Sequence, residues 1–214
     1  ARMKILVQNL YSLETLARVD TLCLDKTGTI TDGKLKVCGI FPMTTLPRGE
    51  LDAMIQSYMA ASDDNNATFQ ALKEAFPPRS GSRQVHKIPF SSQRKWGCVS
   101  LEGIGSVFVG APEKLWGKMP ENLEREMARG RRVLAIGYSG QIWENPEQLP
   151  AEIHPLYGVA LEDTIRPGAQ ETLEFFRREG VEVKVISGDH IKTVTSIARR
   201  AGLSRWQAAV DLSE

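Results

Sequence analysis

The protein has 214 residues, of which 42% are hydrophobic and 25% are charged, and its 27 Lys and Arg residues nearly balance its 26 Asp and Glu residues. A formal net charge of +1 provides no strong field that would recruit nucleic acid or an anionic membrane surface. The composition is that of a globular protein, which excludes disordered, collagen-like and coiled-coil classes. No uncharged apolar run approaches the roughly 18 residues that a membrane span requires. We therefore expect a soluble chain with one large or two small domains.

Apolar spacing predicts helices and a buried strand in the first part of the chain. Residues 4–16 place apolar side chains at helical intervals, and the short apolar run at 19–24 predicts a buried strand. A second amphipathic helix is expected over residues 51–59. Cys23 and Cys98 lie in short apolar runs, so we expect them to be buried, reduced thiols in a cytoplasmic protein.

Short β-rich segments separated by Gly or Ser occupy the middle of the chain, and they predict an antiparallel sheet. These segments are residues 85–90, 96–101 and 106–109. Residues 132–138 and 141–143, joined through Ser139-Gly140, predict a further hairpin.

After the Pro-rich segment 146–155, the pattern alternates between strands and helices. Strands are expected at 156–161 and 181–186, and helices at 167–178 and 190–201. A β–α–β–α series predicts a parallel sheet with helices on its faces. We therefore expect an α/β domain that is split by an inserted α+β domain with an antiparallel sheet.

The strongest chemical signal is the segment 25–31, Asp-Lys-Thr-Gly-Thr-Ile-Thr, which directly follows the first predicted strand. Ligand sites in open α/β sheets lie beyond the carboxyl ends of strands, where Asp25 is the first polar residue. A carboxylate there can attack a phosphorus atom, and neighbouring amides and hydroxyls can hold the phosphoryl oxygens. An ordinary strand-to-loop turn led by Asp is the alternative for a bare DxxG.

The segment 25–31 resembles the phosphorylation signature of the P-type cation-transporting ATPases, a branch of the haloacid dehalogenase-like fold. The resemblance implies that Asp25, Lys26 and Thr27 are catalytic. It also implies that Mg²⁺ binds Asp25 and the Thr27 backbone carbonyl, with a further ligand beyond this chain. Most of that fold has an acid two residues after the nucleophile, but the P-type branch has Thr, as here. Without that acid, the aspartyl phosphate should hydrolyse slowly.

Two later segments resemble the family in the expected order. Ser187-Gly188-Asp189 is similar to the Thr-Gly-Asp element, in which a hydroxyl holds the transferred phosphoryl group, so these three residues are also candidate catalytic residues. Segment 163–167, Asp-Thr-Ile-Arg-Pro, resembles the Asp-x-x-Arg-Pro hinge element. The resemblance places Asp163 and Arg166 with the nucleotide-binding residues.

The predicted insertion carries three segments that resemble nucleotide-binding elements of the family. Segment 90–96 resembles the Phe-Ser-x-x-Arg-Lys element, in which Phe90 would stack on adenine and Arg94 or Lys95 would face the phosphates. The alternative to a nucleotide-binding role is a purely structural strand–turn–strand in which Phe90 packs in the core. Segment 110–113, which begins at Gly110, resembles the Gly-Ala-Pro-Glu element, although Val109 replaces the Lys that usually precedes it. Segment 130–135 resembles the Gly-x-Arg-Val-Leu-Ala strand of the family, and the resemblance implies that Arg132 contacts nucleotide phosphates. A solvated helix end is the alternative.

The resemblance covers essentially the whole chain but only the middle of a pump. It implies a haloacid dehalogenase-like Rossmannoid parallel sheet that is truncated on its C-terminal side. Residues 1–34 would comprise a stalk helix and the first part of the phosphorylation domain. Residues 35–152 would form the nucleotide-binding domain, and residues 153–214 an incomplete second part of the phosphorylation domain.

The resemblance implies the catalytic fragment of a pump that couples ATP hydrolysis, through an aspartyl phosphate on Asp25, to cation transport. The cofactors would be ATP and Mg²⁺, and Ca²⁺ is the favoured ion on overall resemblance. The transmembrane and actuator domains of the same polypeptide would be the partners, at the cytoplasmic face of a membrane. The isolated fragment should bind nucleotide with little turnover. The alternatives are a soluble phosphatase or phosphotransferase with a cap domain, which Thr27 disfavours, and a nucleotide-binding regulatory module.

Overall fold

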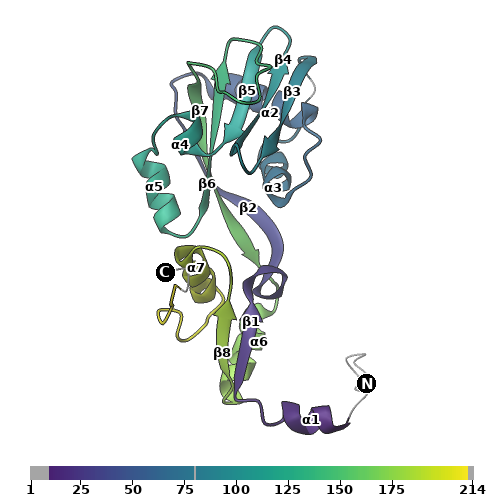
Figure 1. Ribbon diagram of the computed structural model, residues 1–214, viewed down its shortest axis with the longest axis vertical. Coiled ribbons are helices and arrows are strands. Elements are labelled where there is room, and N and C mark those ends of the chain that lie inside the picture. The colour runs from purple at the N-terminus through teal and green to yellow at the C-terminus, as the bar shows by residue number, and fades with distance from the viewer. Residues whose placement is uncertain (1–9, 80, 212–214) are drawn as a thin grey trace. The chain divides into compact units, whose positions relative to one another are not determined.

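The computed structural model describes residues 10–79 and 81–211, which fall into two compact units. The first unit ends at Asp32 and resumes at Ile165, and the second comprises Gly33–Thr164. The chain enters the second unit along strand β2 (Thr31–Pro42) and leaves it along strand β7 (His154–Ile165), as Figure 1 shows. None of the helices in the described part has the length and hydropathy of a membrane span.

The first unit is built on two parallel strands. Strand β1 (Thr21–Asp25) pairs in parallel with β8 (Glu182–Ile186), which confirms the predicted parallel sheet. Alternate side chains of the two strands pack with helices α6 (Ala169–Arg178) and α7 (Ile191–Arg200). The buried members of this core are Ile30, Leu173, Ile197 and Ala201. Helix α1 (Leu10–Leu16) matches the end of the helix expected over 4–16, whose earlier residues lie outside the described ones.

The second unit contains a six-stranded sheet with the order β2-β7-β6-β5-β4-β3. Strands β3 to β7 pair antiparallel with one another. The bounds are β3 (Gln84–Ser91), β4 (Trp96–Leu101), β5 (Gly105–Gly110) and β6 (Arg132–Ser139). The three short strands predicted between 85 and 109 are therefore confirmed.

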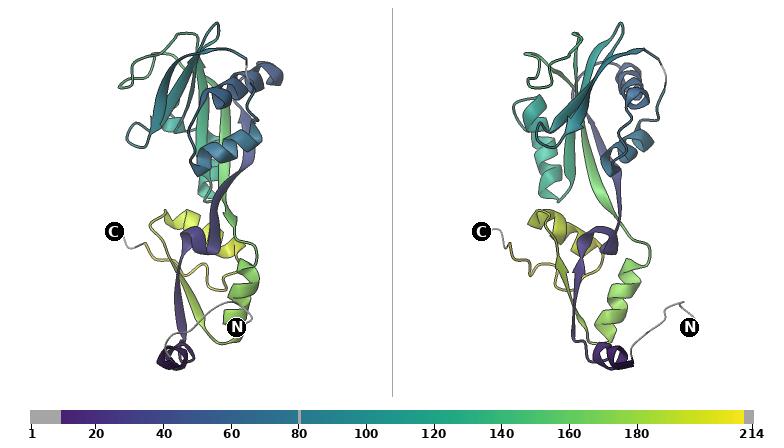
Figure 2. Two further views of the ribbon diagram at one scale, coloured as in Figure 1. Left: turned by 90° about the vertical axis from the view of Figure 1, so that its right-hand side faces the viewer. Right: turned by 45° about the vertical axis from the view of Figure 1, so that its right-hand side comes forward.

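Helices cover both faces of this sheet (Figure 2). Helices α2 (Arg48–Ala61) and α3 (Ala67–Ala75) lie on one face, and they contribute Ile55, Tyr58 and Leu72 to the larger core. Helices α4 (Pro112–Leu115) and α5 (Glu121–Ala128) lie on the other face. The core of that face contains Ile88, Trp96, Cys98, Phe108, Leu115 and Ala135. The unit is thus a helix–sheet–helix sandwich, as expected for an inserted α+β domain.

One predicted strand is absent, and another lies in a different sheet from the one expected. Residues 141–143 form no strand against β6, because β6 pairs with β5 and β7 instead. The backbone of this segment bonds to two buried serine hydroxyls. The Trp143 amide donates to Ser106 Oγ at 2.9 Å and to Ser100 Oγ at 3.2 Å, and the Ser106 hydroxyl donates to the Gln141 carbonyl at 2.7 Å. The strand expected at 156–161 lies in β7, which is antiparallel to β6. It therefore belongs to the inserted unit, which extends to Thr164 rather than to residue 152.

The cysteine prediction was half right. Cys98 is buried in the core, and burial raises the pKa of its thiol to about 12. Cys23 is exposed, because side chains alternate along a strand and the next residue of β1, Leu24, is the one that packs on the core. All three cysteines are free thiols.

Candidate active site

Asp25 is the last residue of β1, and its side chain is exposed. Its register partner on the parallel strand is Ile186, so Ser187 leaves the neighbouring strand at the same edge of the sheet. Carboxyl ends of neighbouring parallel strands form the usual ligand-binding edge of α/β sheets. The structure therefore brings together the two segments that the sequence separates most widely, 25–31 and 187–189.

The chain after Asp25 forms a wide helical turn, η1 (Lys26–Ile30). Two of its residues depart from helical geometry: Thr27 has φ −80° and ψ 126°, and Gly28 has φ 74°. The left-handed region strongly favours glycine, which explains Gly28. The turn closes when the Thr31 amide and hydroxyl both donate to the Lys26 carbonyl. Lys26 and Ile30 are buried, so the Thr27 to Thr29 segment is turned to solvent beside Asp25.

The ammonium group of Lys26 is buried and forms an ion pair with Asp189. The Lys26 side chain is 1% exposed and that of Asp189 is 34% exposed. Asp189 is also held locally, because its amide donates to Ser187 Oγ at 3.2 Å. A buried charge requires a partner of opposite charge, so this ion pair ties the loop after β8 to the loop after β1. Lys26 and Asp189, both candidate catalytic residues, thus contact one another within the fold.

Arg166 lies on the same loop. Its amide donates to the Ile30 carbonyl at 2.9 Å, and its guanidinium donates to the Gly28 carbonyl. Arg166 was assigned to nucleotide binding by resemblance, and the structure places it on the backbone of η1. Asp163 is buried in β7 of the inserted unit.

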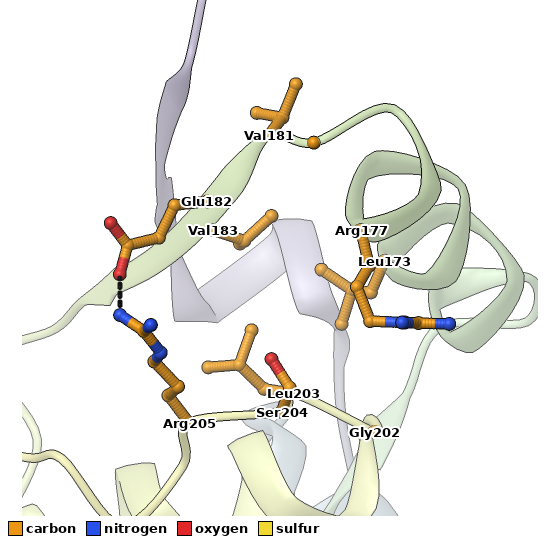
Figure 3. A pocket seen from close by; sticks show the side chains of 10 residues that line it. Leu173, Arg177, Val181, Glu182, Val183, Gly202, Leu203, Ser204 and Arg205 are labelled. Carbon is orange, nitrogen blue, oxygen red and sulfur yellow. Dashed lines mark hydrogen bonds and ion pairs between the residues drawn. The ribbon is translucent and has the colours of Figure 1, made fainter.

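Two cavities flank β8 in the first unit. The smaller, of about 290 Å³, lies where β8 begins, beside Leu173, Val183, Leu203 and the ion pair between Glu182 and Arg205 (Figure 3). It is at the opposite end of the strand from Asp25's partner Ile186. The larger, of about 480 Å³, runs along β8 to Ser187 and Asp189. The larger cavity is therefore the one that reaches the candidate site.

In the inserted unit, the turn between β3 and β4 carries the aromatic and basic candidates. Phe90 is 39% exposed, so part of its ring is free to contact a ligand. The β4 backbone comes very close to it at Gly97, where a Cβ atom would lie 2.7 Å from the Phe90 nitrogen. Only glycine fits opposite Phe90 without a shift of the backbone. Arg94 folds back on its own hairpin, donating to the Pro89 carbonyl at 2.6 Å and lying 5.5 Å from the Trp96 ring centroid.

Gly110 and its following segment meet the same turn. The Ala111 amide donates to the Lys95 carbonyl at 2.9 Å, and Lys95 Nζ lies 3.7 Å from Glu113. A Cβ atom on Gly110 would lie 2.6 Å from the Lys95 carbonyl oxygen, so a larger residue would separate the strands. The antiparallel register therefore brings the 90–96 and 110–113 segments together. Glu113 as the ion-pair partner of Lys95 was not predicted, because sequence distance gives no signal for it.

Arg132 begins β6 and is exposed, whereas its neighbour Arg131 is held by carboxylates. Arg131 forms ion pairs with Glu126 and, at 3.5 Å, with Glu162. The hydrogen bond to Glu126 raises the pKa of Arg131 above its ordinary value. Glu126 also accepts from Arg129 at 2.8 Å. Of these adjacent arginines, Arg132 has the geometry to meet an external anion, and the sequence around Glu126 did not reveal the network.

Val109, where the family usually has Lys, is 2% exposed. It packs in the same core as Val99 and Ile136, which lie on neighbouring strands. The chain therefore has a buried aliphatic side chain at this position, in place of a cation.

No group of three or more His, Cys, Asp or Glu side chains within residues 10–79 and 81–211 is arranged to hold a metal ion. Asp25 and Thr27 are two positions apart in the sequence, and both residues are exposed where β1 leads into η1. Mg²⁺ is usually held by one or two carboxylates together with substrate phosphates and waters. The residues present thus fit a shared metal site that is completed by substrate, and they do not fit an all-protein cage.

The comparisons with known proteins agree with this architecture. The family model for haloacid dehalogenase-like hydrolases matches residues 19–213. The chain is 44% identical over 213 residues to "Probable cation-transporting ATPase exp7" of Streptococcus pneumoniae, covering 99% of this chain and 27% of the relative. It is 39% identical over 202 residues to "Calcium-transporting ATPase CtpE" of Mycobacterium tuberculosis, covering 92% of this chain and 25% of the relative. The chain therefore spans about a quarter of the length of these relatives.

A solved structure of a zinc-transporting PIB-type ATPase has the same fold. The TM-score is 0.64 at 22% identity, over 90% of this chain and 29% of that chain. At this identity the likeness shows the fold alone, and it confirms the split α/β architecture with an inserted unit.

Removal of the Asp189 carboxylate should destabilise the first unit. Asp189→Ala leaves the Lys26 ammonium buried without its ion-pair partner, and we expect a loss of about 2 to 3 kcal/mol, somewhat below the cost of breaking a fully buried pair. Hydrogen exchange of the β1 and β8 amides measures this loss of stability, because the two loops follow directly after these paired strands.

The matched control for this prediction is Glu121→Ala, which removes an exposed ion pair with Arg125 (3.6 Å). It should cost less than about 1 kcal/mol. Equal exchange rates in Asp189→Ala and wild-type protein would show that the buried ion pair does not stabilise the loops.

Proposed function

The chain belongs to the haloacid dehalogenase-like hydrolase family, and on that premise we propose that it is the phosphorylation and nucleotide-binding part of a P-type cation-transporting ATPase. The observation that carries the proposal is the position of Asp25, exposed at the carboxyl end of β1 with Ser187 at the end of the neighbouring strand. The cation-transporting ATPases among its relatives support the same reading.

The chemistry begins with a nucleophilic carboxylate. The Asp25 carboxylate attacks the γ-phosphorus of ATP, a new O–P bond forms, the bond to ADP breaks, and ADP leaves. Exposed amides and hydroxyls of Thr27, Gly28 and Thr29 lie beside the nucleophile, where they can donate to the phosphoryl oxygens. The Ser187 hydroxyl approaches from the neighbouring strand. Water then attacks phosphorus and releases phosphate, which restores the Asp25 carboxylate.

Thr27 accounts for the slow hydrolysis that we propose for the aspartyl phosphate. The residue two positions after the nucleophile offers a hydroxyl, which is too weak an acid or base at neutral pH to activate water as a carboxylate would. The phosphorylated intermediate should therefore persist long enough to drive a conformational cycle. A soluble phosphatase, the competing reading, would gain nothing from that persistence.

Mg²⁺ would be held by the Asp25 carboxylate and the Thr27 carbonyl, and it supplies neutralisation of charge on the transferring phosphoryl group. Lys26 supports the loop from the buried side through its ion pair with Asp189. That ion pair orients the Thr27 main chain, since Lys26 immediately precedes it.

In this proposal, the inserted unit binds the nucleotide. The exposed part of the Phe90 ring is suited to stack on the base, and Arg132 supplies an exposed cation at the same end of the sheet. Lys95 adds a second cation, balanced by Glu113. Asp163 and Arg166 belong to the segment that resembles the family's hinge element.

The parent polypeptide would carry the transmembrane and actuator parts, with this chain at the cytoplasmic face of the membrane. Ca²⁺ is the proposed ion, because relatives over 92% of the chain are named calcium-transporting ATPases. The chain spans about a quarter of the length of these relatives, and alone it should bind ATP and Mg²⁺ with little turnover.

The nucleophile is tested by phosphorylation. The full-length polypeptide, incubated with γ-labelled ATP and Mg²⁺, should form a phosphoenzyme that hydroxylamine cleaves, because acyl phosphates react with hydroxylamine. Asp25→Asn should abolish the label. Asp20→Asn, at the opposite end of the strand, should retain it. Label that persists in Asp25→Asn would refute the assignment of the nucleophile.

The nucleotide site is tested by binding. Phe90→Ala should weaken ATP binding to the chain by about fivefold or more, since loss of base–aromatic stacking costs about 1 to 3 kcal/mol. Val85→Ala, on the same strand and also exposed, is the control and should bind normally. Calorimetric titration measures both. Unchanged affinity in Phe90→Ala would place the base elsewhere.

The ion is tested by transport. Membrane vesicles that contain the full-length polypeptide should accumulate Ca²⁺ on addition of ATP, and Asp25→Asn vesicles should not. Phosphoenzyme formation should rise with Ca²⁺ but not with Zn²⁺ or K⁺. A phosphoenzyme that responds to another cation, with no Ca²⁺ uptake, would change the ion assignment while leaving the class intact.

A further inference from the structure

Arg166 is attached to the candidate nucleophile loop at two points. Its amide bonds to the Ile30 carbonyl at 2.9 Å, and its guanidinium bonds to the Gly28 carbonyl. Both acceptors lie within η1, on either side of Thr29. A main-chain bond together with a side-chain bond from one residue restrains translation and rotation of that segment.

The position of these bonds matches the part of the loop that needs support. Lys26 is fixed by burial and by Asp189, and Ile30 is fixed in the core. Between them, Thr27 and Gly28 have non-helical backbone angles and are exposed. The Gly28 carbonyl, at the left-handed residue, is held by the Arg166 guanidinium. This bond therefore sets the direction of the peptide groups that lie beside Asp25.

We infer that Arg166 is a positioning residue for the Asp25 loop, and that it acts on phosphoryl transfer without contributing to nucleotide affinity. The inference rests on the proposed function. It replaces the nucleotide-binding role that the resemblance implies for Arg166. The residue acts through the Gly28 carbonyl, so its effect is on the geometry of Asp25, Thr27 and Gly28 relative to the phosphorus atom.

The expected size follows from the demands of in-line attack. A misplacement of about 1 Å can cost about a hundredfold in rate. Arg166→Gln removes the guanidinium but leaves the main-chain bond to Ile30. We therefore expect phosphorylation to slow by about ten- to a hundredfold, with the dissociation constant for ATP unchanged within about twofold.

The experiment compares two phosphoryl donors in the full-length polypeptide. ATP tests the complete reaction, and acetyl phosphate tests the Asp25 loop without base, ribose or polyphosphate. With acetyl phosphate, the Asp25 carboxylate attacks phosphorus and acetate leaves. Arg166→Gln should slow phosphorylation by the same factor with both donors. Arg166→Lys, which can donate one hydrogen bond to the Gly28 carbonyl, should recover part of the rate.

The control variant is Arg178→Gln, which changes an arginine on α6 that bonds to Glu174 and lies away from the loop. It should leave both reactions and ATP affinity unchanged. Hydrogen exchange of residues 26–30 gives a readout that needs no turnover. It should rise in Arg166→Gln but not in Arg178→Gln.

Each outcome decides the inference. A rate loss with ATP alone, or a weakened ATP dissociation constant, would make Arg166 a nucleotide ligand and overturn the positioning role. Equal exchange of residues 26–30 in Arg166→Gln and wild type would also overturn it. If the wild-type polypeptide forms no phosphoenzyme with either donor, the proposed function fails, and the exchange experiment still decides whether Arg166 holds the loop.

Discussion

A lysine ammonium group that is buried directly beside the candidate nucleophile sets the geometry of the first unit. Lys26 is 1% exposed, and a charge at that depth is stable in a protein only with a partner of opposite charge. Its partner, Asp189, comes from the loop after β8, so the ends of β1 and β8 must stay in register for the pair to form. Burial of Lys26 also turns the next residues outward, which leaves Thr27 to Thr29 exposed beside Asp25. The same charge therefore joins two distant segments and presents the loop between them.

In the inserted unit, hydrogen-bond register has the role that charge has in the first unit. Trp96 pairs with Gly110, and Gly110 pairs with Ala135, so three short segments with candidate roles arrive at one end of the sheet. Close backbone approach at Gly97 and Gly110 keeps the strands in contact there. Carboxylates then divide the cations into two groups. Arg131 is held inside the fold by Glu126 and Glu162, whereas Arg132 is exposed.

Local pattern predicted much of this fold, and tertiary competition explains the errors. Apolar spacing predicted β1, β8, α6 and α7, because each buries one face against a core. Residues 156–161 were misassigned because a run buried on both faces looks the same in a parallel and an antiparallel sheet. The expected strand at 141–143 does not form, because its backbone bonds to the hydroxyls of Ser100 and Ser106. No local sequence pattern encodes the position of these hydroxyls. Motif order predicted that segments 25–31 and 187–189 meet, but not that Lys26 and Asp189 are ion-paired or that Arg166 holds Gly28. The nucleotide and metal roles remain predictions.

The isopropyl group of Val109 has a consequence for the response of the protein to its solution environment. Where a lysine would contribute a fixed positive charge, this chain has an aliphatic side chain that is packed in the core of the inserted unit. Attraction between exposed charges weakens as ions screen it, whereas contact between an aromatic ring and a base does not depend on charge. Under the proposed function, nucleotide binding should therefore respond less to ionic strength here than in a protein with lysine at that position.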